Sequence, residues 1–108
     1  MSVDTAGVEA DRLSHQPARP VLLFFHSRAS GRCRRVHGYL SQVLQRRRNH
    51  QTFRVVQVDI DDRPELAAHF GVSKVPTIIV LGGSVPLSRV EEPSGRAAVE
   101  AALASWLH

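Results

Sequence analysis

The unbroken apolar run Val21–Phe25 constrains the fold more strongly than any other segment of this 108-residue chain. A strand with one face in water alternates apolar and polar side chains, whereas a run without alternation has both faces buried. The sheet that contains this run must therefore be covered on both sides. Two further runs, Phe53–Ile60 and Pro76–Leu81, are rich in β-branched residues and predict two more strands of the same sheet.

The segments that follow these runs have the spacing of helices. Apolar residues recur at helical spacing over Cys33–Leu44, which predicts a helix that ends at the basic residues 46–48. Asp62 is the predicted N-cap of a second helix, and Gly71 ends it. A last helix is predicted to begin at Ser94 and to dock on the sheet through three apolar residues, Val99, Leu103 and Trp106.

The order of these elements predicts the topology. The first strand–helix–strand unit is expected to be parallel, and Gly82-Gly83 predicts a hairpin to an antiparallel strand near residues 87–90. Residues 1–19 are weakly defined, with a helix that ends near Leu13 and a short first strand as the expectation. We therefore expect one α/β domain over residues 1–108, a three-layer sandwich with a mixed central sheet of four to five strands and helices on both faces.

The charges are unevenly distributed along the chain. The net charge is +4, yet the segment from Arg12 to Val58 contains ten arginines and no Asp or Glu. Such a segment favours acidic partners, or it is simply the solvated face of a helix. It lacks a recognised nucleic-acid-binding motif and has few interleaved aromatic residues, so we do not expect a nucleic-acid partner.

Cys33 is the only cysteine, and it excludes several kinds of site. An internal disulfide, a dithiol couple within the chain and a multi-cysteine zinc site all need more than one thiol. No apolar run approaches the length of about 18 residues that a membrane-spanning helix needs. The first 20 residues also lack the apolar core of a secretory signal. We expect a cytoplasmic monomer with a reduced thiol, no cofactor and no membrane partner.

Four segments carry a resemblance to a known family. They are Val21-Leu-Leu-Phe-Phe-His, Val58-Asp-Ile-Asp, Phe70-Gly-Val-Ser-Lys-Val-Pro-Thr and Leu81-Gly-Gly. From Val21 onward the chain resembles the thioredoxin family, and the third segment is the most specific. The resemblance implies a thioredoxin-like fold in which a cis Pro76 faces the loop Ser30–Cys33. It also implies a groove for an extended protein segment, lined by Gly31, Arg32, Lys74, Val75, Pro76 and Val90.

The motif of this chain departs from the family pattern. Where the family has Cys-x-x-Cys, this chain has Ser30-Gly31-Arg32-Cys33, so Ser30 replaces the nucleophilic cysteine. We expect Ser30 to cap the helix that follows, because no adjacent base is present to activate its hydroxyl. The buried Asp of the family and its Lys partner fall at Phe24 and Gln57. The Trp before the motif, the Pro inside it, the helix-bending Pro and the Gly of the third substrate loop fall at Ala29, Arg32, Gly38 and Glu91.

Two interpretations of Cys33 remain open. Its place on the apolar stripe predicts a half-buried core thiol. Alternatively, His37 on the same helix face and the charge of Arg34 favour a usable thiolate. A single thiol can form a mixed disulfide, but an external thiol such as glutathione must then resolve it. A metal bound by His26, Cys33 and His37 is a less specific alternative, and we assign no metal site.

These observations lead to three hypotheses. The leading one is a thioredoxin-like protein with a divergent Ser-x-x-Cys site that binds an extended thiol-bearing or acidic protein segment beside Pro76, without conventional dithiol disulfide-reductase turnover. The alternative is a monothiol oxidoreductase or thiol transferase that uses Cys33 with an external thiol. The third is a non-redox adaptor that docks a partner through its basic helix. Because fold alone does not decide among them, the site must.

Overall fold

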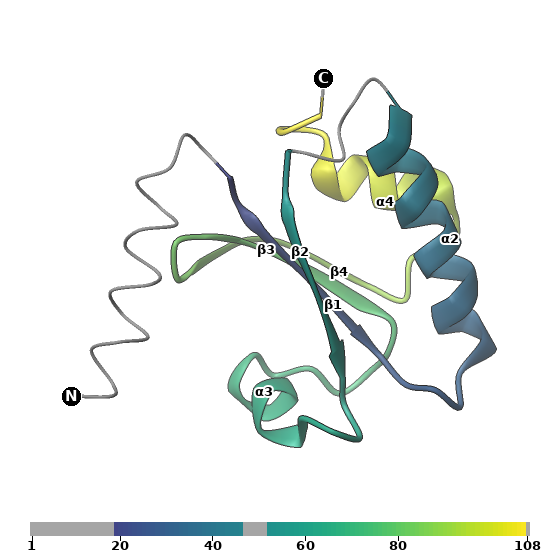
Figure 1. Ribbon diagram of the computed structural model, residues 1–108, viewed down its shortest axis with the longest axis vertical. Coiled ribbons are helices and arrows are strands. Elements are labelled where there is room, and N and C mark those ends of the chain that lie inside the picture. Colours follow the sequence, from purple (N-terminus) through teal and green to yellow (C-terminus); the bar gives the residue numbers. More distant parts are fainter. Residues whose placement is uncertain (1–18, 47–51, 108) are drawn as a thin grey trace.

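The computed structural model describes residues 19–46 and 52–107 (Figure 1). Some expectations lie outside the described residues. They are the N-terminal helix, the short first strand and the basic residues Arg47 and Arg48 at the predicted end of the first long helix. Seven elements follow one another in the described part of the chain. They are β1 (Val21–His26), α2 (Gly31–Gln45), β2 (Arg54–Asp59), α3 (Pro64–His69), β3 (Thr77–Gly82), β4 (Val85–Glu91) and α4 (Arg96–Leu103).

The strands form one mixed four-stranded sheet in the order β2-β1-β3-β4. Strands β1 and β2 are parallel, and the chain crosses between them through α2. Strand β3 is antiparallel to both β1 and β4. The predicted α/β fold with a mixed sheet is therefore confirmed.

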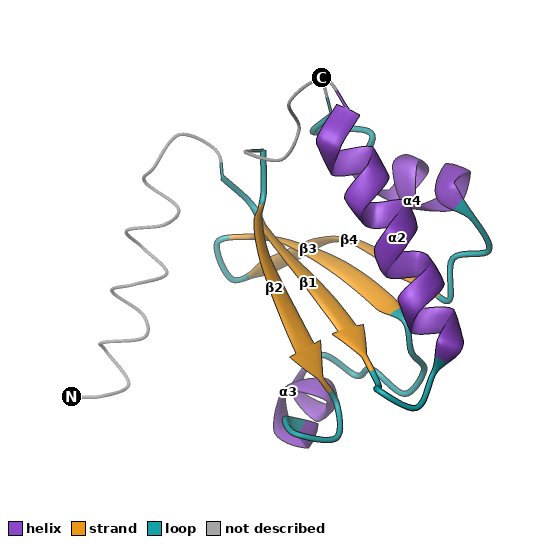
Figure 2. Ribbon diagram, turned by 45° about the vertical axis from the view of Figure 1, so that its right-hand side comes forward, coloured by secondary structure: helices purple, strands orange, loops and turns teal. Residues whose placement is uncertain are grey.

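Helices lie on both faces of this sheet. Helices α2 and α4 cover one face, and α3 lies on the opposite side (Figures 1 and 2). The apolar run of β1 explains this arrangement, because Leu22 and Phe24 belong to the cluster under α2 and α4. Leu23 and Phe25 belong to the cluster on the α3 side. The continuous run thus supplies both core layers, as a strand buried on both faces must.

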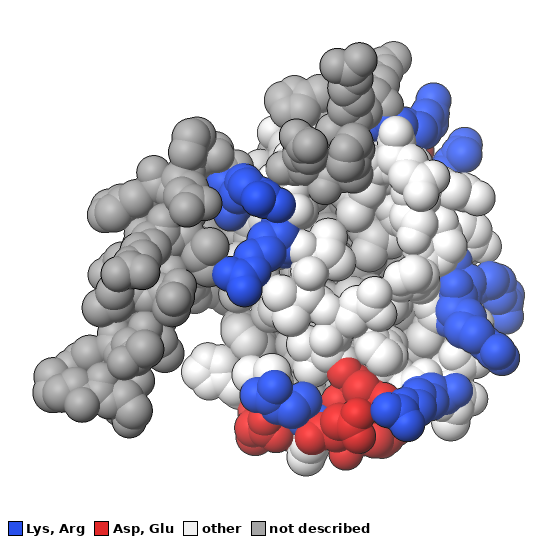
Figure 3. Space-filling model, viewed as in Figure 1, with Lys and Arg blue, Asp and Glu red and all other residues white. Residues whose placement is uncertain are grey.

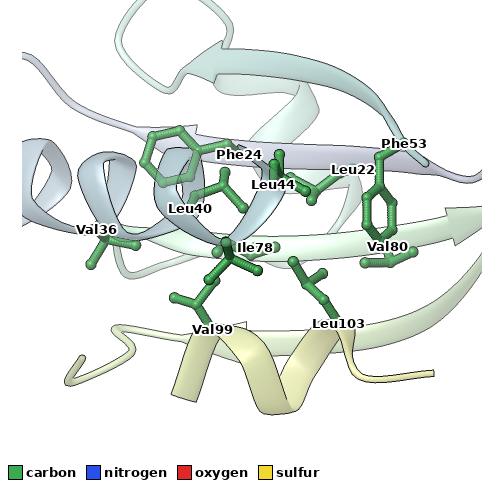
Figure 4. Packing of buried hydrophobic residues seen from close by; sticks show 11 residues of the cluster. Leu22, Phe24, Val36, Leu40, Leu44, Phe53, Ile78, Val80, Val99 and Leu103 are labelled. Carbon is green, nitrogen blue, oxygen red and sulfur yellow. The ribbon is translucent and has the colours of Figure 1, made fainter. Parts of the chain in front are cut away.

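The cluster under α2 and α4 fixes how α2 is turned about its axis. Val36 and Leu40 of α2, and Val99 and Leu103 of α4, are at most 3% exposed. In Figure 4 these side chains lie close to those of the strands, with Val99 beside Ile78. Because Cys33 is on the same stripe of α2, this packing also directs Cys33 toward the sheet.

Two element starts differ from the sequence prediction. The N-cap of α3 is Arg63, which makes no side-chain capping bond, whereas Asp62 was predicted. The Asp62 carboxylate instead accepts a hydrogen bond from Arg28 at 3.3 Å. The N-cap of α4 is Gly95, one residue after the predicted Ser94.

The start of strand β4 and the end of helix α4 also differ from the sequence prediction. Strand β4 begins at Val85, before the predicted segment, because Gly83 adopts a φ of 63° and closes the turn tightly. Helix α4 ends at Leu103, so Trp106 lies beyond it. Trp106 still packs on the core, with its ring centroid 6.0 Å from that of Phe53. Within the described residues, no helix combines the length and apolar character needed to cross a membrane.

Candidate functional site

Ser30 follows the loop after β1 and is the N-cap of α2. Its Oγ accepts a hydrogen bond from the backbone N–H of Cys33 at 3.3 Å. The first N–H groups of a helix have no partner within the helix, so the hydroxyl satisfies one of them. This is the capping role that the sequence predicts. Gly31 and Arg32 follow as exposed residues of the first helical turn.

Cys33 is a free thiol and is 3% exposed. It nevertheless lines a pocket of about 410 Å³ that lies between α2 and strands β1 and β2. We call this the Cys33 pocket. Histidine and arginine residues also line it. The lining residues are Phe24, His26, Ser27, Arg28, Cys33, Arg34, His37 and Gln57.

The back wall of the Cys33 pocket holds an aromatic ring and an amide. Phe24 and Gln57 lie directly opposite each other on the parallel strands β1 and β2. These are the positions at which the family resemblance implied a buried Asp and its Lys partner. His37 fits between them, with its Nε2 3.3 Å from Nε2 of Gln57 and its ring centroid 5.7 Å from that of Phe24. His37 therefore shares a pocket with Cys33 while its own contacts go to Gln57 and Phe24.

The cations at the mouth of this pocket differ in their surroundings. Arg28 lies 3.1 Å from Asp59 and 3.3 Å from Asp62, so two carboxylates offset its charge. Arg34 makes no ion pair with any residue in the described ranges 19–46 and 52–107, and it is exposed. Arg34 thus contributes the net positive charge at this rim.

A metal site is not supported by this geometry. Although His26, Cys33 and His37 share the pocket, no group of three His, Cys, Asp or Glu side chains among the described residues is placed to hold a metal ion. The His26 ring stacks on Phe24 with a centroid distance of 5.6 Å. We therefore do not pursue the metal site that the sequence suggested as an alternative.

The Pro76 turn begins strand β3. The Val75–Pro76 peptide bond is cis, the form that the family resemblance implied. Oγ1 of the buried Thr77 donates to the carbonyl oxygen of Lys74 at 2.7 Å. The backbone N–H of Glu92 donates to the carbonyl oxygen of Pro76, also at 2.7 Å. The turn is therefore fixed from within and from the end of β4.

The end of β4 supplies the third segment near this turn. Val90 pairs with Ile78 and packs against the cluster under α2 and α4, so its side chain contributes to the core. Glu91 is extended and pairs with Thr77. The left-handed backbone, with a φ of 45°, is at Glu92. The backbone form that favours glycine thus lies one residue after Glu91, where the family glycine was placed from the sequence.

Glu92 is the site residue that sequence reasoning missed. Its Oε1 lies 3.0 Å from Nη1 of Arg32, in the first turn of α2. Since its backbone also bonds to Pro76, Glu92 connects the motif to the Pro76 turn. An acidic residue in a loop gives no local signal for this role. Of the predicted groove residues, Arg32 and Pro76 each contact Glu92, and the Pro76 ring is fully buried. Lys74 is exposed, and Val90 is partly buried against the cluster under α2 and α4.

A mixed sheet in the order β2-β1-β3-β4, helices on both faces and a cis-proline turn that contacts the end of β4 define a protein of the thioredoxin-fold class. The model of the Thioredoxin family matches residues 7–106. The thioredoxin of Mycobacterium tuberculosis is 31% identical over 99 residues, which are 92% of this chain and 82% of that protein. The chain therefore belongs to the thioredoxin family.

Other matches are to a longer relative and to solved structures of lower identity. The bifunctional thioredoxin reductase/thioredoxin of Mycobacterium leprae is 34% identical over 92% of this chain, which spans only 21% of that protein. Two solved structures share the fold at lower identity. Thioredoxin NaTrxh from Nicotiana alata has a TM-score of 0.73 at 16% identity, covering 97% of this chain and 87% of that one. Mitochondrial thioredoxin 3 from Saccharomyces cerevisiae has a TM-score of 0.70 at 19% identity, covering 91% and 88%.

Proposed function

We propose that this thioredoxin-family protein binds an extended protein segment beside Pro76 and does not perform conventional dithiol disulfide-reductase turnover. The observation that carries the proposal is Ser30, whose hydroxyl caps α2 in a chain whose only cysteine is Cys33. Reduction of a disulfide within one protein molecule needs one thiol to attack and a second to release the product. Without an external thiol, a single thiol can only hold a partner in a mixed disulfide. A single domain over residues 1–108, a cytoplasmic location and a monomeric state stay predictions.

The fixed backbone around Pro76 supports the binding part of this proposal. The bonds from Thr77 to Lys74 and from Glu92 to Pro76 hold the turn in one conformation. A preorganised turn lowers the entropy that binding must offset. Lys74 is exposed two residues before Pro76, which favours a segment with acidic character.

Reduction of insulin by dithiothreitol tests the absence of turnover. We expect the rate with the wild-type chain to equal the rate with Cys33→Ala and with no protein, because the chain lacks a second thiol and Cys33, at 3% exposed, is closed to a protein disulfide. A thioredoxin with an intact Cys-x-x-Cys motif is the positive control. Turnover by the wild-type chain that disappears in Cys33→Ala contradicts the proposal.

Binding to an immobilised peptide library tests the role of Pro76. We expect Pro76→Ala to reduce the binding of selected peptides about tenfold or more, because the Pro76 ring is fully buried and its removal loosens the packing under the turn that presents Val75. Pro86→Ala is the matched control, since Pro86 is exposed on β4. Equal binding by both variants places the peptide surface elsewhere, and circular dichroism checks that both variants are folded.

A monothiol oxidoreductase is the second candidate, because Cys33 lines a pocket with His26, His37 and Arg34. In this reaction the Cys33 thiolate attacks a small disulfide, forms a mixed disulfide and releases one thiol. A second external thiol then attacks the mixed disulfide, regenerates Cys33 and leaves as part of a new disulfide, so thiols and electrons balance. Mass spectrometry after incubation with glutathione disulfide tests the first step. An unmodified Cys33 in the native protein, with full modification after unfolding in urea, rules out this candidate.

A further inference from the structure

A second pocket lies at the β4 side of α2, away from the Cys33 pocket. It has a volume of about 350 Å³ and is formed by α2 and the turn between β4 and α4. We call it the Arg35 pocket, and it adjoins the Pro76 turn because the Glu92 N–H bonds to the carbonyl oxygen of Pro76. Its lining residues are Arg32, Arg35, Val36, Tyr39, Glu92, Pro93 and Ser94.

The charges that line this pocket do not balance. Arg32 and Glu92 offset each other across 3.0 Å. Arg35 is exposed and has no acidic partner within residues 19–46 and 52–107. The first turn of α2 also lacks an acidic residue, so nothing on that turn offsets the cations near the positive end of the helix. The pocket therefore has one uncompensated positive charge.

Two residues that carry hydroxyl groups are among those that line the pocket. Tyr39 is one turn after Arg35 on α2, and its ring packs against the core. Ser94 lies on the opposite wall, in the turn that leads to α4. The Arg35 guanidinium is a donor that suits a carboxylate, which only accepts hydrogen bonds, and the lining contains further hydroxyl-bearing residues.

Basic side chains also lie along α2, which forms one wall of the pocket. In Figure 3 basic side chains gather at the right of the molecule along α2, whereas the acidic side chains gather at the bottom, next to other basic groups. Arg34 and Arg35, which form no ion pair with another described residue, are both exposed on α2. This potential attracts an acidic segment before contact is made.

We propose that the Arg35 pocket binds the carboxylate of an Asp or Glu side chain of the protein segment that lies beside Pro76. The inference rests on the proposed function and adds that the bound segment carries an acidic side chain. One uncompensated charge matches one carboxylate, whereas a phosphate dianion would leave a negative charge unpaired in the pocket. Because an extended chain advances about 3.3 Å per residue, the acidic residue lies within a few positions of the residue beside Pro76.

A positional-scanning peptide library tests this inference. Nine-residue peptides are random except at one position, which is Asp, Glu, Asn, Gln or phosphoserine. We expect the wild-type chain to prefer Asp or Glu over Asn or Gln by about fivefold at one position, the strength of a favourable exposed ion pair. Arg35→Gln removes this preference while binding of the Asn and Gln peptides persists, and Arg35→Glu turns it toward basic residues in a companion library with Lys.

The matched control is Arg54→Gln, because Arg54 is exposed on β2 at the opposite edge of the sheet. This variant is expected to keep the full preference. Peptide binding without an acidic preference, or with a stronger preference for phosphoserine, overturns the inference and leaves the proposed function standing. No binding of any peptide by the wild-type chain overturns both.

Discussion

At the scale of single residues, a serine at position 30 has a different chemical role from the cysteine that the family resemblance implies there. A cysteine at a helix N-terminus is stabilised as a thiolate and attacks, whereas a serine hydroxyl stays protonated and caps. Ser30 Oγ makes this capping bond with the N–H of Cys33. A serine hydroxyl needs a general base to become a nucleophile, whereas it caps a helix without one. We therefore treat Ser30 as a structural residue with a measurable stability effect.

Ser30→Ala is expected to lower the free energy of unfolding by about 1 kcal/mol, the typical effect of a lost N-cap. Urea denaturation followed by circular dichroism measures this change. Ser73→Ala is the matched control, because Ser73 is exposed in the loop before Lys74 and is expected to change stability by less than about 0.5 kcal/mol. Equal effects of the two substitutions contradict a capping role for Ser30.

At the scale of elements, the sequence pattern predicted those strands and helices whose formation depends on neighbouring residues. The run Val21–Phe25 and the stripe of α2 follow from burial, and the structure has both elements in place. The cap of α3 could not be predicted, because Arg28, 34 positions away in the sequence, takes the Asp62 carboxylate. Glu92 was missed for the same reason, since Arg32 and Pro76 hold its left-handed backbone from distant segments. Contacts between segments far apart in sequence leave no periodic signal.

The packing of α4 gives a prediction at this scale. Leu103 is fully buried in the cluster under α2 and α4, whereas Leu87 on β4 is 55% exposed. Leu103→Ala is expected to lower the free energy of unfolding by about 2 to 5 kcal/mol, because it removes buried methyl groups and leaves a cavity. Leu87→Ala, the same substitution at the surface, is expected to cost less than about 0.5 kcal/mol. Similar unfolding midpoints for the two variants in urea contradict this assignment of the core.

At the scale of the whole molecule, two pockets lie on different sides of the start of α2. The Cys33 pocket is lined from α2, β1 and β2, whereas the Arg35 pocket is lined from α2 and the turn after β4. The Pro76 turn lies beside the end of β1, where Phe25 pairs with Thr77. The start of α2 stands between the two pockets, with Cys33 on one side and Arg32 bonded to Glu92 on the other. A reagent that reaches the thiol from the β2 side therefore need not meet a segment beside Pro76. Chemistry at Cys33 and binding at Pro76 become separable properties.

This separation predicts that blocking the thiol spares the groove. After alkylation of Cys33 by iodoacetamide, we expect the affinity for selected peptides to stay within about twofold, because the added group occupies the Cys33 pocket rather than the Pro76 turn. Fluorescence polarisation with labelled peptides measures the affinity, and Cys33→Ser treated with the same reagent is the control. A large loss of binding in the alkylated wild-type chain, absent in the control, means that the segment crosses the thiol, and the two places then act as one site. Retained binding means that the loss of the first cysteine left the recognition surface of the fold intact.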